Sequence, residues 1–310
     1  MLARSERSSR ERLRLGTLGL LLSAFVGLFG VLSPGARAAS GQYVALGDSY
    51  TAGPLIPPPN PDFPGCIKSL NNYPHLVAKD RHLPLSDVSC SGAKTDDMTR
   101  SQDVDPNPDP PPQFSALKSN TKVVSITISG NDIGFSEISQ KCASTTGTDT
   151  PCQDTYVHGN TDEIHERITR TAPKVAAVIA GIHERAPNAA VYVLNYLPIL
   201  PDNQPKWTID DRESGHGCWP TVPVSDGDAA YVVAKEKELN QMLADQVAAD
   251  KATNKAKLVD AYSDGVGHDA CQLPGTRWVE PEVAPVGAAP LHPNLDGMKG
   301  YAKALEGALQ

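Results

Sequence analysis

Residues 42–53 read Gln-Tyr-Val-Ala-Leu-Gly-Asp-Ser-Tyr-Thr-Ala-Gly, and the rest of the chain is interpreted around them. The apolar run from Tyr43 to Leu46 stops at a glycine, as a buried strand does when it ends in a tight turn. Ligands bind at the carboxyl ends of the strands in an open parallel α/β sheet, so Ser49 is placed as a nucleophile facing a cleft. The competing interpretation is an ordinary strand-to-helix turn in which Asp48 or Ser49 caps the next helix.

Two later runs are predicted to be strands that also end in residues suited to a binding site. The first, residues 85–90, leads to Gly92, where the missing Cβ lets a backbone amide approach a ligand closely. The second, the β-branched run 122–128, is predicted to be central in the sheet and leads to Asn131, whose side chain can donate two hydrogen bonds. The alternatives are a plain turn glycine and an asparagine that caps a turn.

The remaining pattern predicts further strands and helices around a loop that carries His292. Prolines in 54–64 and 105–112 predict irregular loops, and 134–160 is expected to be a disulfide-linked loop. His292 lies directly before a proline, near the end of the chain and far in sequence from Ser49. Strands are predicted over 190–194 and 257–260, and helices over 73–81, 162–186, 226–249 and 296–309.

The first 38 residues have the order of a secretory signal peptide. Five arginines within residues 4–14 precede an apolar run over 15–32, and Ala36-Arg37-Ala38 is a small-x-small cleavage site. An uncleaved membrane anchor is the alternative, because the apolar run is close to the length that spans a bilayer. Cleavage after Ala38 would leave residues 39–310 as a single secreted domain without a stable membrane anchor.

The charge balance argues against nucleic acid as a partner. The chain has 28 Lys and Arg residues and 36 Asp and Glu residues, a net charge of −8. Loss of residues 1–38 would remove six basic and two acidic residues, which leaves 22 against 34 and a net charge of −12. Such an acidic surface repels phosphate backbones and anionic lipid headgroups at long range.

Six cysteines, an even number, predict disulfides in a chain that is exported. No two of them have the Cys-x-x-Cys spacing that zinc sites use, so no metal site is predicted. Sequence alone does not choose among the possible pairings, and the sequential one is the hypothesis adopted: Cys66–Cys90, Cys142–Cys152 and Cys218–Cys271.

Four blocks, in this order, resemble the motifs of the SGNH (GDSL-like) hydrolases. They are Gly47-Asp48-Ser49-Tyr50, Gly92, Gly130-Asn131-Asp132 and His292-Pro293, and they cover essentially the whole chain after residue 38. The six-cysteine layout and two further segments look most like the branch of secreted actinobacterial lipases, esterases and phospholipase A1: His268-Asp269-Ala270-Cys271 and Trp278-Val279-Glu280-Pro281. No Gly-x-Ser-x-Gly motif occurs, which argues against the α/β-hydrolase fold.

The resemblance implies a flavodoxin-like three-layer α/β/α sandwich with a five-stranded parallel sheet. It makes Ser49 the nucleophile and His292 the general base, since a serine hydroxyl needs an adjacent imidazole to take its proton. It also implies an oxyanion hole formed by the backbone N–H groups of Ser49 and Gly92 and the side-chain amide of Asn131.

One position departs from the pattern of many family members. An aspartate three residues before the histidine orients the imidazole in those proteins, whereas this chain has Ala289. We therefore expect a Ser–His dyad in which a backbone carbonyl accepts a hydrogen bond from Nδ1 of His292. The carbonyl lies near Ala289 or Pro290, and Ala289 is the assignment adopted. A distal acid, Asp296 or Asp269, would instead complete a triad.

The expected function is that of a secreted serine esterase or lipase that hydrolyses carboxyl esters of lipids. Phospholipase A1 activity is one form that this function could take. No cofactor is predicted, the expected partner is the ester substrate, and a monomer is expected. A carbohydrate acetylesterase is the alternative enzyme, although aromatic residues make up only 5% of the chain, which is sparse for stacking on sugars. A catalytically silent secreted binding module is the alternative from another class, since fold alone does not choose a function.

Overall fold

In the computed structural model, which describes residues 43–201 and 218–309, five short runs pair as a parallel sheet. The strand order is β2-β1-β3-β6-β7, so β3 is central, as its β-branched composition predicted. Tyr43 pairs with Val123 and Val123 with Ala190, so the three inner strands start level and their carboxyl ends share one edge. The strands are β1 (Tyr43–Gly47), β2 (Leu85–Asp87), β3 (Val123–Thr127), β6 (Ala190–Leu194) and β7 (Lys257–Val259).

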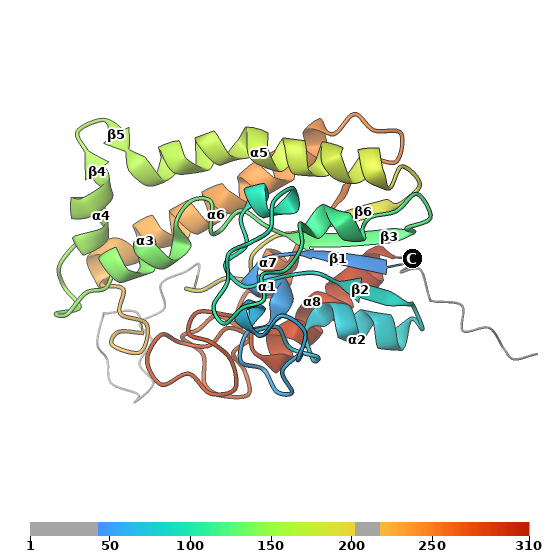
Figure 1. Cartoon of the computed structure of the whole chain (residues 1–310). Helices are drawn as coiled ribbons and strands as arrows, with labels where there is room; N and C mark the ends of the chain where they lie inside the picture. The colour runs from blue at the N-terminus through green and yellow to red at the C-terminus, as the bar shows by residue number, and fades with distance from the viewer. Residues whose placement is uncertain (1–42, 202–217, 310) are drawn as a thin grey trace, which may run out of the picture. The chain divides into compact units, whose positions relative to one another are not determined.

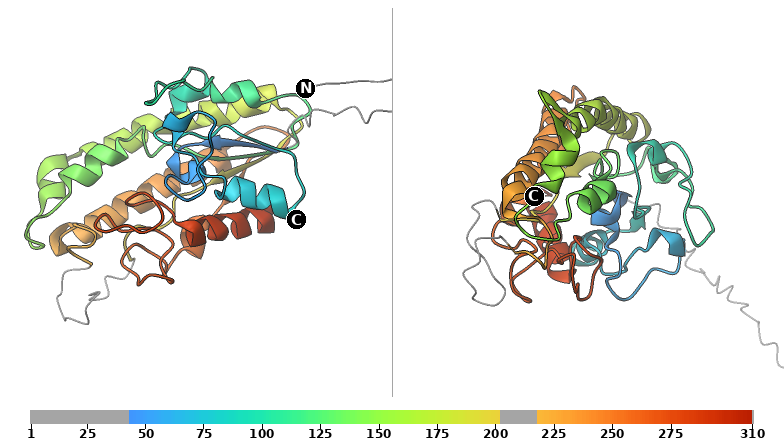
Figure 2. Two further views of the ribbon diagram at one scale, coloured as in Figure 1. Left: turned by 60° about the horizontal axis from the view of Figure 1, so that its bottom comes forward. Right: turned by 90° about the vertical axis from the view of Figure 1, so that its left-hand side faces the viewer.

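Helices cover both faces of the sheet (Figures 1 and 2). α2 (Tyr73–Asp80) and α8 (Leu295–Ala308) pack together on one face, and α5 (Glu163–Arg185) and α6 (Asp226–Ala249) pack together on the other. The fold is therefore the expected α/β/α sandwich with a five-stranded parallel sheet, and the described residues belong to one compact unit. None of the helices in the described ranges combines the length and apolar character of a membrane span.

α5 and α6 are much longer than the strands that they flank. They have 23 and 24 residues, which corresponds to about 35 Å each, whereas a five-residue strand spans about 17 Å. The C-terminal end of each helix leads to the start of the next strand, so the N-terminal halves of both helices project beyond the carboxyl edge of the sheet (Figure 1).

The projecting halves of α5 and α6 meet two short helices that the sequence interpretation had missed. α3 (Phe135–Lys141) and α4 (Pro151–Tyr156) lie in the stretch 134–160, which was expected to be only a loop. That expectation was wrong because neither helix is long enough to show apolar periodicity, and α3 has no buried side chain. A two-stranded hairpin, β4 (Val157–His158) and β5 (Thr161–Asp162), then leads into α5.

Short elements complete the carboxyl edge: α1 (Ser49–Ala52), α7 (Ala261–Asp264), and the 3-10 turns η1 (Pro64–Cys66), η2 (Thr95–Met98) and η3 (Gln113–Ala116). The signal peptide predicted over residues 1–38 lies outside the described residues.

The three disulfides pair the cysteines in sequence order, as expected. Cys66–Cys90 joins the proline-rich loop after α1 to the exit of β2, and Cys142–Cys152 joins α3 to α4. Cys218–Cys271 joins the segment before α6 to the loop after α7. Each disulfide therefore links segments that follow the strands, at the edge of the sheet where ligands bind in such folds.

Candidate active site

Ser49 is held at the carboxyl edge by a turn that requires glycine at its start. Gly47 has a φ of +132°, and a Cβ there would lie 2.5 Å from the carbonyl oxygen of Thr127 on the neighbouring strand. Asp48 is the N-cap of α1, because its carboxylate accepts a hydrogen bond from the backbone N–H of Tyr50 at 2.9 Å. Ser49 is the first residue of α1, so its hydroxyl lies at the edge of the sheet directly after the helix cap formed by Asp48. The turn therefore caps the helix and also presents the serine.

His292 reaches this hydroxyl from the other end of the chain. Its Nε2 lies 2.8 Å from Ser49 Oγ, and its Nδ1 lies 2.6 Å from the carbonyl oxygen of Pro290. The assignment of the orienting carbonyl to Ala289 was therefore wrong by one residue: the Ala289 carbonyl accepts the backbone N–H of His292 instead. The backbone at Leu291 has a φ of +57°, and this turn sets which of the two carbonyls faces the ring.

Neither distal acid contacts the imidazole. Asp296 bonds with Lys299, and Asp269 accepts from the backbone of Cys271 and the side chain of Gln272. No carboxylate among the described residues is hydrogen-bonded to His292. Burial lowers the pKa of His292 below its ordinary value of 6.5, against a smaller opposing effect of the Pro290 carbonyl, so the imidazole is neutral and able to accept a proton at neutral pH.

A buried ion pair supports the loop that carries His292. Arg277 donates to Glu280 at 2.6 Å, and both side chains are almost fully buried. Asn294 donates to the other carboxylate oxygen of Glu280, and the Glu280 backbone N–H donates to the carbonyl of His292. Glu280 lies in the Trp-Val-Glu-Pro segment noted above, but nothing in the sequence pattern indicated this supporting role.

The three oxyanion-hole candidates follow three adjacent strands, β2, β1 and β3. The N–H of Cys90 donates to the Gly47 carbonyl, which holds the Gly92 turn beside the Ser49 turn. Asn131 Nδ2 donates to the Ala93 carbonyl at 3.0 Å, which uses one of its two hydrogens. Within the described part of the chain, the backbone N–H groups of Ser49 and Gly92 have no protein acceptor.

Tyr196 links the turn that carries Ser49 to the turn that carries Asn131. Its hydroxyl donates to Asp48 at 2.6 Å and accepts from the backbone N–H of Gly130 at 2.7 Å. Burial raises the pKa of Asp48 to about 7, while the hydrogen bond from Tyr196 acts to lower it. Sequence reasoning missed Tyr196, although its place two residues after the predicted strand 190–194 was a usable signal.

Ser49 opens onto a pocket whose lining is mainly apolar. Asp48, Ser49, Tyr50, Gly130, Asn131 and Tyr196 form one end of the lining. The projecting helices and their neighbours supply the rest: Ile133, Phe135, Ile138, Cys152, Ile164, Ile199, Tyr231, Val232, Lys235, Glu236 and Leu239. The described residues include no group of three or more His, Cys, Asp or Glu side chains placed to hold a metal ion.

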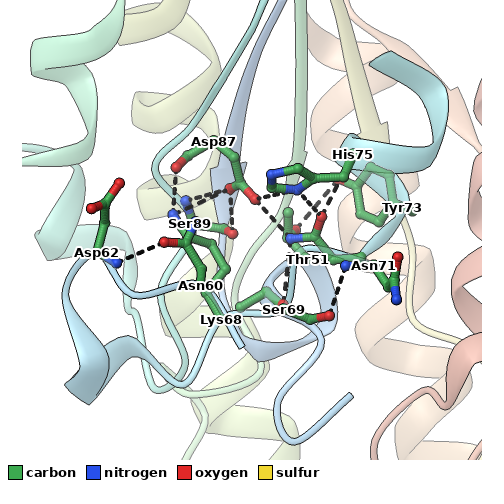
Figure 3. A network of polar contacts seen from close by, with 12 residues as sticks. Thr51, Asn60, Asp62, Lys68, Ser69, Asn71, Tyr73, His75, Asp87 and Ser89 are labelled. Carbon is green, nitrogen blue, oxygen red and sulfur yellow. Dashed lines mark hydrogen bonds and ion pairs between the residues drawn. The ribbon is translucent and has the colours of Figure 1, made fainter. Parts of the chain in front are cut away.

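A polar network around Asp87 fixes the proline-rich loop beside α1 (Figure 3). The carboxylate of Asp87 accepts from Ser89 at 2.6 Å and from Asn72 at 2.7 Å, and it forms an ion pair with Lys68. Ser69, next to Lys68, donates its N–H to the carbonyl of Ala52 at the end of α1. The loop is thereby tied both to the sheet and to α1, which carries Ser49.

Comparisons with known proteins show which family and fold this chain resembles. The GDSL-like lipase/acylhydrolase family model matches residues 45–299. Lipase 2 of Streptomyces coelicolor is 35% identical over 299 residues, which cover 91% of this chain and 94% of the relative. Two crystal structures are similar, each over 86% of this chain and 98% of the other: the extracellular lipase of Streptomyces rimosus (TM-score 0.66, 28% identity) and phospholipase A1 of Streptomyces albidoflavus NA297 (TM-score 0.67, 24% identity).

Proposed function

The chain belongs to the GDSL-like lipase/acylhydrolase family and is a carboxylic ester hydrolase, and on this premise we propose that it is exported and hydrolyses lipid esters through an acyl-enzyme on Ser49. The observation that carries the proposal is the 2.8 Å separation of Ser49 Oγ and His292 Nε2 at one end of an apolar pocket.

In the acylation step, Ser49 Oγ attacks the ester carbonyl while His292 Nε2 takes the hydroxyl proton. The imidazolium then gives this proton to the leaving alcohol as the tetrahedral intermediate collapses. The Pro290 carbonyl fixes the tautomer with the proton on Nδ1, so that Nε2 is the basic nitrogen. A neutral carbonyl stabilises the imidazolium less than a carboxylate would. The carbonyl therefore helps His292 by orienting the ring rather than by supplying a negative charge.

The oxyanion that forms in this step needs donors that are already in place. The N–H groups of Ser49 and Gly92 and the second Nδ2 hydrogen of Asn131 can supply them. Loss of one such donor costs about 10²–10³ in turnover in serine hydrolases. Water, activated by the same imidazole, then attacks the acyl-enzyme and releases the acid.

The pocket is better suited to binding the long acyl chain of a lipid ester than to binding a small acetyl group. Its walls are aliphatic and aromatic side chains from α3, α5 and α6, and apolar surface of this kind binds hydrocarbon. Relatives named lipases fit this choice, and nothing in the pocket favours a carbohydrate acetylesterase.

Export is supported by three observations. Residues 1–38 have the basic region, apolar run and small-residue site of a signal peptide in the usual order. All six cysteines are paired, and the similar lipase of S. rimosus is described as extracellular. Disulfides persist in oxidising compartments, which is consistent with a working place outside the cytoplasm.

The deciding experiment compares residues 39–310 with the Ser49→Ala variant on p-nitrophenyl esters of increasing chain length. We expect activity that disappears in the variant, labelling of Ser49 by an organophosphate, and a higher kcat/KM for medium and long chains than for acetate. A preference for acetate would favour the acetylesterase. Absence of both hydrolysis and labelling would favour the silent binding module.

A further inference from the structure

Among the large apolar side chains exposed on the two loops that flank the site, four lie in the segments 54–67 and 283–291. Leu55 is 62% exposed and Ile67 is 45% exposed in the loop after α1; Val283 is 50% exposed and Val286 is 71% exposed in the loop that leads to His292. These four residues are called the rim. The two loops touch, because the N–H of Ala289 donates to the carbonyl of Pro54.

The rim also lies close to the reacting groups. Leu55 directly follows Pro54, which bonds to the loop of His292. Ile67 directly follows Cys66, whose disulfide partner Cys90 precedes the Gly92 turn, and the N–H of Ser91 donates to the Cys66 carbonyl. The rim therefore has one part beside the general base and one part beside the oxyanion hole.

At several positions in these loops the backbone has a left-handed conformation that residues with a Cβ rarely adopt. Seven non-glycine residues in the described part have a positive φ, and five of them lie in these two loops: Leu55, Phe63, Ile67, Ala284 and Leu291. Left-handed backbone is most unfavourable for a β-branched residue such as Ile67, whose φ is +49°. Such strain persists where the surrounding structure enforces it, and it clusters at functional sites.

The loops that carry the rim have few charged side chains at the surface. Residues 54–61 and 283–291 contain no Asp, Glu, Lys or Arg; among the charged residues that adjoin the rim in sequence, Asp62 and Glu282 are exposed and Lys68 is buried. An apolar edge flanked by exposed carboxylates, on a protein with a net negative charge, is suited to an electrically neutral apolar surface and poorly suited to an anionic one.

The loops are also rigidly supported, so the rim stays exposed. The Asp87 network (Figure 3) and the Cys66–Cys90 disulfide fix the loop after α1, and the Arg277–Glu280 pair fixes the loop of His292. Neither loop can fold its apolar side chains inward without breaking these contacts.

From these observations we propose that the rim is a docking surface for a zwitterionic lipid surface. The proposal rests on the lipid-ester function proposed above: Leu55, Ile67, Val283 and Val286 enter between the headgroups and bring Ser49 to esters held in that surface. It identifies the substrate as an aggregated lipid rather than a single dissolved ester.

The test measures binding without turnover. Residues 39–310 carrying Ser49→Ala are titrated with phosphatidylcholine vesicles and separated by sedimentation; residues 1–38 are omitted because their apolar run would itself bind lipid. Adding Leu55→Asn and Ile67→Asn is expected to lower the vesicle affinity at least tenfold. Asparagine adopts positive φ readily, so the melting temperature is expected to stay the same or to rise.

Matched variants separate docking from damage. Val157→Asn changes a valine that is 37% exposed on β4, outside the rim, and is expected to leave the affinity unchanged. Val283→Ser with Val286→Ser, on the other loop, is expected to reproduce the loss. With Ser49 intact, the Leu55 and Ile67 double variant is expected to hydrolyse a water-soluble ester at close to the parent rate.

Three results would overturn the docking proposal: unchanged affinity in both rim variants, an equal loss in Val157→Asn, or binding of the parent protein to anionic vesicles alone. Failure of the esterase proposal would look different, because the intact protein would then not hydrolyse the soluble ester while vesicle binding could still depend on the rim.

Discussion

The proposed role of His292 as general base rests on burial of the imidazole and on a backbone carbonyl rather than on a carboxylate. Burial disfavours the charged ring and lowers its pKa, and the Pro290 carbonyl only partly offsets this. The protonated ring cannot accept the Ser49 proton, so activity is lost as pH falls through this lowered pKa.

We therefore expect kcat/KM for a soluble ester to fall on the acid side with an inflection below pH 6.5, the ordinary histidine value. The profile should be measured in the parent and in Asp48→Asn, which keeps a capping oxygen but removes a carboxyl group that titrates near pH 7. An inflection at or above pH 6.5 in both proteins would contradict a buried, carboxylate-free base.

The role of the Tyr196 hydroxyl can also be tested separately. It stabilises ionised Asp48, so Tyr196→Phe is expected to raise the pKa of Asp48 further above its unfolded value. A carboxyl group whose folded pKa is raised makes the folded state less stable as pH rises through the interval between the unfolded and folded pKa values. The variant extends that interval to higher pH, so its stability deficit relative to the parent should grow between about pH 6 and pH 9.

The measurement is urea unfolding of both proteins across this pH range, with Tyr192→Phe, on the preceding strand β6, as the control. Loss of the acceptor for the Gly130 N–H should also lower kcat, because Asn131 is the next residue. A pH-independent deficit would mean that Tyr196 only fills space.

Ser49, Gly92 and Asn131 could be singled out in the sequence because each follows a predicted strand, and the resemblance to a known family added His292. The structure brings Ser49 and His292 within hydrogen-bond distance, and the catalytic roles of all four residues stay a prediction. Which carbonyl orients the imidazole was not readable, since it depends on one left-handed residue, Leu291. The Arg277–Glu280 support was equally hidden, because sequence spacing does not show that a charged pair is buried.

Among the elements, the long helices determine the pocket. Strands with β-branched runs and helices with sustained apolar spacing were predicted close to their observed bounds, 226–249 included. α3 and α4 were missed because their order comes from contacts with other helices rather than from their own pattern: α3 packs on α4, α4 packs on α6, and Glu137 of α3 pairs with Arg167 of α5. The apolar pocket could therefore not have been foreseen, since much of its lining comes from these four helices.

Val232 on α6 tests whether acyl chains occupy this pocket. It lines the pocket beyond the reacting end, so Val232→Trp should fill the space that a long chain needs. We expect kcat/KM for long-chain esters to drop by about tenfold or more, with a much smaller change for acetate. Ala230→Trp, at an exposed position on the same helix, is the control of equal bulk. Equal effects of Val232→Trp on short and long esters would place the acyl chain elsewhere.

At the scale of the whole molecule, the described part divides into a sheet held by packing and an active-site edge held by covalent links. The core strands and α2, α5, α6 and α8 contain no cysteine, whereas all three disulfides join segments at or beyond the carboxyl edge. Loop closure of this kind contributes about 2–4 kcal/mol for each disulfide in the chain-entropy model.

This arrangement predicts different kinetic signatures for different disulfides. Cys66→Ala with Cys90→Ala frees the turn that presents the Gly92 N–H, so kcat should fall for every chain length while far-UV circular dichroism is retained. Cys142→Ala with Cys152→Ala loosens α3 and α4, which form the pocket wall, so KM should rise mainly for long-chain esters. The two pairs control for each other, because both remove a short-range disulfide of comparable stabilising effect. If both double variants lost kcat and KM in the same proportion, the disulfides would be supporting the fold as a whole, and the separation between sheet and active-site edge would be wrong.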